Sequence, residues 1–87
     1  MEGDLKPQIK ELLVEMLFLQ GVAPASIGDD DKLEETLGVD SVALFQVVAG
    51  LEEAFGIRIE DKDFSAEKFA TVAGMETVVK EKLAANG

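Results

Sequence analysis

Apolar residues recur at helical spacing in three stretches of the chain, and the positions between them are mostly polar or charged. In the first stretch, Asp4 and Pro7 suit the cap and first turn of a helix, and Gly21 with Pro24 would end it. This pattern predicts an amphipathic helix. Its apolar face is expected to comprise Leu5, Ile9, Leu12, Leu13, Met16 and Leu17.

The second stretch predicts a helix over residues 41–55. Asp40 precedes it and is a preferred N-cap residue, and Gly56 follows it and suits the left-handed conformation that ends many helices. Its apolar residues are Leu44, Phe45, Val47, Val48, Leu51 and Phe55.

The third stretch predicts a last helix that Thr71 caps and that extends to about Ala84. Lys80 and Lys82 lie near its end, where the helix dipole favours positive charge. The side chains expected to be buried are Val72, Met75, Val78, Val79 and Leu83.

The connecting segments complete the expected fold. Residues 21–40 read as a long acidic loop, in which residues 31–36 could form a helical turn. Residues 57–59 read as a short extended connector, and residues 63–69 as a short helix. No alternating strand pattern persists. We therefore expect an all-α fold in a single domain, 1–87: a small four-helix bundle with three long helices, one short helix and a long loop between helices 1 and 2.

The composition excludes several classes of protein. With 8 basic and 18 acidic residues, the formal net charge is −10, which opposes binding to nucleic acid or anionic membranes and favours partners with basic surfaces. The chain has no histidine and no cysteine, so Ser-His and Cys-His catalysis within it is excluded. It has neither an N-terminal signal pattern nor an apolar run long enough to span a bilayer. We expect a cytoplasmic monomer that is not an enzyme.

The segment Leu37-Gly38-Val39-Asp40-Ser41-Val42 is the strongest candidate for a functional site. It places a serine hydroxyl at the predicted N-terminus of a strongly apolar helix. The free N–H groups and the positive dipole at such an end favour a phosphate. Since no histidine or cysteine is present to activate Ser41, another enzyme would have to modify it.

The pattern Leu-Gly-x-Asp-Ser-hydrophobic, followed by a helix that ends Leu51-Glu52-Glu53-Ala54-Phe55-Gly56-Ile57, resembles the acyl carrier proteins. The resemblance covers nearly the whole chain and includes the long acidic loop. It implies that Ser41 receives a 4′-phosphopantetheine arm from coenzyme A through a phosphopantetheinyl transferase. It also implies that the arm's thiol carries acyl cargo as thioesters between acyl-loading and acyl-transferring enzymes of fatty acid, lipid or polyketide biosynthesis.

The same resemblance assigns roles around the serine. Asp40 would cap the helix and assist the transferase during loading. Leu37 and Val42 would flank the site as apolar contacts. The exposed face of the helix would bind partner enzymes, through Val42, Phe45, Gln46, Val48, Ala49, Glu52 and Glu53.

Two positions on that face depart from the pattern of carriers in fatty acid synthesis, which usually present acids there. Ala43 and Gln46 stand two and five residues after the serine, and Phe45 makes the face more apolar. Fewer charges should slow association with basic partners. We therefore expect a specialised carrier that serves a dedicated lipid, polyketide or amino-acid pathway.

Two alternatives stay open beside this interpretation. An aminoacyl or peptidyl carrier would share the serine site, and an unmodified helical adaptor would use only the acidic surface. A calcium site is disfavoured, because residues 29–31 lack the alternating ligands of an EF-hand, and residues 61–72 lack its glycine and closing glutamate. We expect no dedicated metal site.

Overall fold

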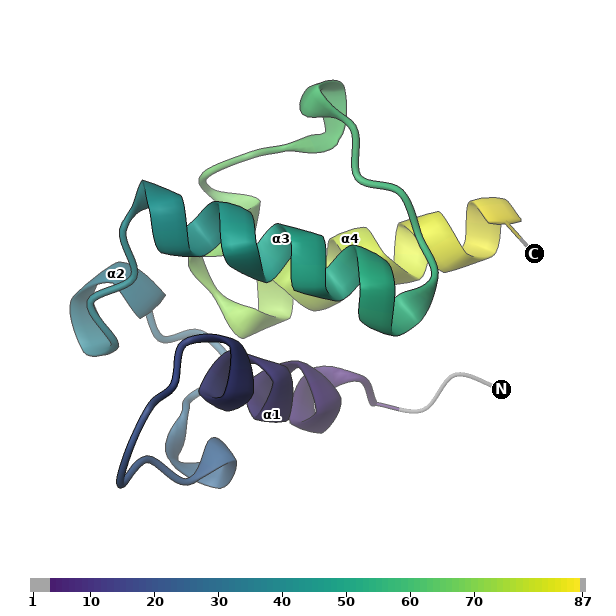
Figure 1. Cartoon of the computed structure of the whole chain (residues 1–87). Helices are drawn as coiled ribbons and strands as arrows, with labels where there is room; N and C mark the ends of the chain where they lie inside the picture. Colours follow the sequence, from purple (N-terminus) through teal and green to yellow (C-terminus); the bar gives the residue numbers. More distant parts are fainter. Residues whose placement is uncertain (1–3, 87) are drawn as a thin grey trace.

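The computed structural model describes residues 4–86, and every regular element in this part is helical (Figure 1). The long helices are α1 (Lys6–Met16), α3 (Ser41–Phe55) and α4 (Val72–Asn86), and each packs against the other two. A short helix, α2 (Leu33–Thr36), lies in the loop between α1 and α3. The predicted class, a small all-α bundle with three long helices and one short one, is confirmed.

The short α-helix lies earlier in the chain than expected. Residues 63–69 do not form a continuous helix, which corrects that part of the prediction. They lie between and within two single 3₁₀ turns, η2 (Asp61–Asp63) and η3 (Lys68–Ala70). The helical turn suspected within residues 31–36 is the one that forms α2, and a further 3₁₀ turn, η1 (Pro24–Ser26), precedes it.

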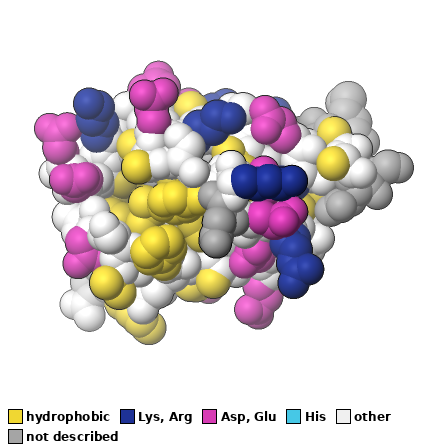
Figure 2. Space-filling model, turned by 90° about the horizontal axis from the view of Figure 1, so that it is seen from above, with side chains coloured by type: hydrophobic (Ala, Val, Ile, Leu, Met, Phe, Trp, Pro, Cys, Tyr) yellow, Lys and Arg dark blue, Asp and Glu magenta, His cyan; other side chains and the backbone are white. Residues whose placement is uncertain are grey.

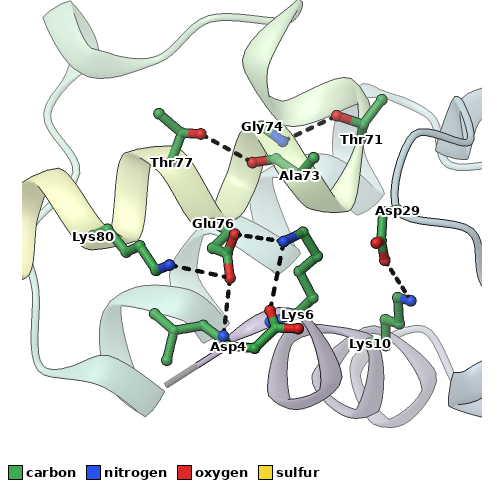
Figure 3. Close-up of polar contacts among 11 residues, drawn as sticks. Asp4, Lys6, Lys10, Asp29, Thr71, Ala73, Gly74, Glu76, Thr77 and Lys80 are labelled. Atoms are coloured by element: carbon green, nitrogen blue, oxygen red, sulfur yellow. Dashed lines mark hydrogen bonds and ion pairs between the residues drawn. The ribbon is translucent and has the colours of Figure 1, made fainter. Parts of the chain in front are cut away.

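The predicted caps hold α3 and α4. The Asp40 carboxylate accepts the Ala43 N–H at 2.8 Å, and Gly56 takes the left-handed conformation with φ 66°. The Thr71 hydroxyl accepts the Gly74 N–H at 3.0 Å (Figure 3). A Cβ on Gly74 would overlap the Lys68 carbonyl oxygen, so this glycine lets the backbone of α4 approach η3.

The ends of α1 differ from the expected ones. Leu5 holds the N-cap position, and Asp4 lies one residue earlier, where its carboxylate accepts the Lys6 N–H at 3.1 Å. That hydrogen bond is the main reason why the pKa of Asp4 lies below its usual value. At the other end the helix stops at Met16, and Phe18 adopts a left-handed backbone with φ 52°.

Buried apolar side chains from all three long helices and from the loops form one core. Ile9 and Leu13 of α1, Val47 and Leu51 of α3, and the predicted residues of α4 lie within it, except that Leu83 is half-buried. Loop residues complete it: Ile27, Leu33, Val39, Ile57 and Phe69. The long loop is therefore anchored to the core at several points.

A buried carboxylate ties the start of α1 to α4 (Figure 3). Glu76 accepts the Leu5 N–H at 2.9 Å and pairs with the Lys6 ammonium at 2.9 Å. Lys80, one turn further along α4, lies 3.6 Å from the same carboxylate. The hydrogen bond from Lys6 to Glu76 raises the pKa of the lysine, because it stabilises the charged ammonium.

Candidate functional site

Ser41 is the first residue of α3, and its side chain is exposed. The first hydrogen bond of the helix runs from the Leu44 N–H to the Asp40 carbonyl at 2.8 Å. The N–H groups of Ser41 and Val42 precede that bond and therefore point out of the helix end. The serine hydroxyl thus lies at the positive end of a 15-residue helix, where a phosphate is favoured.

Asp40 holds this end of the helix in place. Its backbone is extended, and its carboxylate faces the first turn of α3 through the bond to Ala43. The side chain is nevertheless exposed, so the second carboxylate oxygen remains open to solvent or to a partner. Its predicted capping role is confirmed by this geometry.

A small hollow of about 120 Å³ opens beside the serine. Ser41 and Leu44 of α3 line one side of it, Leu33 of α2 lines another, and Phe69 of η3 lies among its lining residues. Residues that are distant in the sequence therefore meet at Ser41. Leu33 and Val39 both belong to the core and both line this hollow. The contacts that anchor the long loop therefore also shape the surroundings of Ser41.

Three phenylalanine rings lead from the surface of α3 into the core. Phe45 stacks on Phe64 with ring centroids 5.4 Å apart, and Phe64 stacks on Phe69 at 5.3 Å. Phe45 is 60% exposed and Phe69 is fully buried. Such offset stacks stabilise by about 0.5–1.5 kcal/mol beyond the buried area.

A second hollow, of about 300 Å³, lies against the outer two rings. It is lined by Phe45 and Val48 of α3 and by Ile59, Glu60 and Phe64 of the segment that follows. Figure 2 shows that hydrophobic side chains gather into a patch on the upper side of the molecule, with acidic and basic side chains around it. The sequence placed Phe64 and Phe69 only within the short helix expected over residues 63–69, and did not link either ring to Phe45.

The residues predicted to bind partners mostly lie on the open surface. Val42 is 68% exposed, and Gln46, Ala49 and Glu53 are exposed as well. Val48 is half-buried, as is Leu37 beside the site.

Glu52 has a different position from Glu53. It is half-buried, and its carboxylate accepts the Ile59 N–H at 2.7 Å. It therefore ties the connector after α3 back onto the helix, in a structural role that adjacent Glu53 does not share.

Neither a metal-binding cluster nor a membrane-spanning helix is found within residues 4–86. No group of three or more acidic residues is arranged to hold a metal ion there. Within the same described part, no helix is long and apolar enough to cross a membrane.

Comparisons with known proteins agree with the geometry. Residues 8–79 match the family model described as "Phosphopantetheine attachment site". An acyl carrier protein of Campylobacter hominis is 36% identical over 73 residues, which are 84% of this chain and 86% of that protein. An acyl carrier protein of Wolinella succinogenes is 44% identical over 64 residues, 74% of this chain and 78% of the relative.

A solved structure shares the fold. The solution structure of a holo acyl carrier protein from Nitrosomonas europaea superposes with a TM-score of 0.81 at 25% sequence identity. The match covers 94% of this chain and 99% of that one.

Proposed function

We propose that Ser41 bears the phosphopantetheine arm, because this chain belongs to the acyl carrier protein family. The chain is a carrier and not an enzyme, and its cofactor is covalently bound 4′-phosphopantetheine. When attached, the group supplies a terminal thiol that holds acyl cargo as a thioester. The missing cysteine of the chain is therefore no obstacle to thioester chemistry.

The exposure of Ser41 at the N-terminus of α3 is the observation that carries this proposal. A phosphodiester at this hydroxyl would lie against the first-turn N–H groups and the positive end of the dipole. Asp40 would keep the turn in place while its open carboxylate oxygen faces the phosphopantetheinyl transferase. The serine and its surroundings thus fit the group.

The exposed face of α3 supports a specialised carrier rather than one for housekeeping fatty acid synthesis. We assign docking of acyl-loading and acyl-transferring enzymes to Val42, Phe45, Gln46, Val48, Ala49 and Glu53. Two large apolar side chains, Val42 and Phe45, stand open on this face, and Glu53 is its exposed acid. Partners that recognise it would use an apolar contact with few ion pairs, in a lipid or polyketide pathway. The proposal includes the cytoplasmic location and monomeric state expected from the sequence.

The cargo has apolar surface within reach on the same helix. The hollow beside Ser41 has about the volume of four water molecules, so it admits only a short segment of chain. The larger hollow at Phe45 and Phe64 begins one helical turn further along α3. We assign the apolar end of a longer cargo to that hollow.

Mass spectrometry tests the attachment site. The chain is incubated with coenzyme A, magnesium and a broad-specificity phosphopantetheinyl transferase, beside Ser41→Ala and the matched control Ser26→Ala. We expect one phosphopantetheine on the wild type and on Ser26→Ala, and none on Ser41→Ala. An unmodified wild type, or equal modification of Ser41→Ala, would contradict the proposal.

The pathway is tested with the holo-protein. Housekeeping fatty-acid enzymes should load and elongate it more slowly than they do a standard carrier, with a weaker dependence on salt. Equal rates for the two carriers would show that the apolar face does not set the pathway.

A further inference from the structure

A groove runs between α1 and α3. Ala49 and Glu53 on its α3 side also belong to the docking face proposed above, whereas its α1 side lies outside that face. Two adjoining hollows, of about 320 and 150 Å³, share Leu12 and Ala54 as lining residues. Met16 of α1 and Gly50 of α3 complete the apolar floor. A Cβ on Gly50 would lie 3.1 Å from the Met16 sulfur, so the glycine lets this flexible side chain lie across the helix.

The rim of the groove is acidic. Glu11 and Glu15 line it on the α1 side, Glu53 lines it on the α3 side, and all three side chains are exposed. Glu11 and Glu15 are one turn apart, a spacing at which like charges repel. Among the described residues, the ion pairs engage other acids, namely Asp4, Asp29, Asp63 and Glu76.

Phe18 follows Met16 by two residues, just beyond the end of α1 that borders the groove. It is the most exposed large apolar side chain in the described part of the chain, at 87%. Its backbone is left-handed, a conformation that disfavours side chains with a Cβ. Folding gains little from a phenylalanine at this position.

We infer that this groove binds an amphipathic helix of a partner whose apolar stripe is flanked by lysine and arginine. The groove extends along α1 from Gln8 to Met16, about two helical turns, which is long enough for a helix with anchors spaced three, four and seven residues apart. Its apolar α1 residues are Leu12 and Met16. The acidic rim selects the sign of the partner's charge. A second copy of this chain, also at −10, would be repelled, as would an anionic membrane.

Docking at this groove would also account for three unfavourable features that lie on α1, just after its end and in the groove beside it. The strained Phe18, the repelling pair of glutamates and the open apolar floor each oppose the stability of the isolated chain. Such departures from local preference are expected at functional sites. In the complex, Phe18 would become a buried aromatic anchor and the rim charges would be neutralised.

The test uses the Ser41→Ala chain, so that its result does not depend on the arm. The probe is a synthetic helical peptide of leucine and lysine with one apolar stripe. Two control peptides have the same composition in scrambled order, or glutamate in place of lysine. Binding is followed by chemical-shift changes in NMR spectra and by titration at two salt concentrations. We expect only the striped basic peptide to bind, with shifts centred on Leu12, Glu15, Met16 and Gly50.

Variants of the chain separate docking from general charge. Phe18→Gly should lower the affinity for the peptide roughly tenfold and raise the melting temperature of the chain. A residue with a purely structural role would not give this combination. Glu11→Gln with Glu15→Gln should weaken binding and its salt dependence more than the matched pair Glu67→Gln with Glu81→Gln, which removes the same charge elsewhere. Equal losses in the two pairs, unchanged affinity in Phe18→Gly, or shifts centred on Val42 and Phe45 would each overturn the inference.

Discussion

Helices α1 and α3 end in the same backbone motif, but the left-handed position holds phenylalanine in one and glycine in the other. In α3 the Ile57 N–H reaches back to the Glu52 carbonyl at 3.1 Å, around the left-handed Gly56. In α1 the Leu19 N–H reaches back to the Val14 carbonyl at 3.1 Å, around the left-handed Phe18. Both are Schellman ends, for which glycine is the usual residue.

The difference separates what folding requires from what it only tolerates. Glycine readily adopts the left-handed conformation found at Gly56, and α3 ends at the predicted position. At Phe18 the hydrogen bonds of the motif hold a residue that disfavours the conformation, by roughly 1–2 kcal/mol for an ordinary side chain. The Phe18 side chain is 87% exposed, so burial in the core does not offset this free-energy cost.

The largest change in stability is expected when the glycine at the end of α3 is replaced. Gly56→Ala should destabilise the chain by about 1–2 kcal/mol, because the alanine would have to adopt φ 66°. A Cβ on Gly56 would meet no other atom within 4 Å, so packing does not contribute and the loss reports the backbone alone. Urea unfolding at fixed pH measures it. A loss below the error of the extrapolation would show that the α3 end tolerates a side chain, as the α1 end does.

The reciprocal change should act in the opposite direction and be smaller. Phe18→Gly should stabilise the chain by about 0.5–1 kcal/mol, because relief of the left-handed strain exceeds the added entropy of glycine in the unfolded chain. Phe18→Ala is the matched control, since it removes the ring and keeps the strain. If both variants gave the same stability, the ring rather than the backbone would be the source of the change.

The comparison also shows which parts of the molecule sequence reasoning can reach. Asp40, Gly56 and Thr71 act on residues within a few positions of themselves, and each was assigned its role from local preference. Phe18 was not, because nothing in local preference places a phenylalanine where a glycine belongs. The helix was instead expected to end at Gly21, which does adopt a positive φ, but within the loop.

Contacts that join distant residues lay outside that reasoning for a different reason. The Phe45, Phe64 and Phe69 stack requires two irregular turns to be placed against α3, and irregular turns carry no periodicity. Glu76 binds Leu5 across 71 positions of sequence, which only the packed helices can reveal. The position of Ser41 at the start of α3 was predictable because it depends on local residues. The hollow beside it was not, because residues of three elements meet there.

The smallest effect concerns the other end of α1, where charge rather than backbone geometry makes the contact. The pKa of Asp4 is held below its ordinary value, chiefly by the Lys6 N–H, and a carboxylate with a depressed folded-state pKa stabilises the fold above its unfolded pKa. This contribution is lost as the pH falls through the folded pKa, so stability should decline below about pH 4. Asp4→Asn should flatten this part of the pH profile slightly, whereas the gain from Phe18→Gly should be independent of pH. Unfolding curves recorded between neutral and acidic pH for both variants check the distinction. A Phe18→Gly gain that changed with pH would mean that charges, and not only backbone strain, contribute at the C-terminal end of α1.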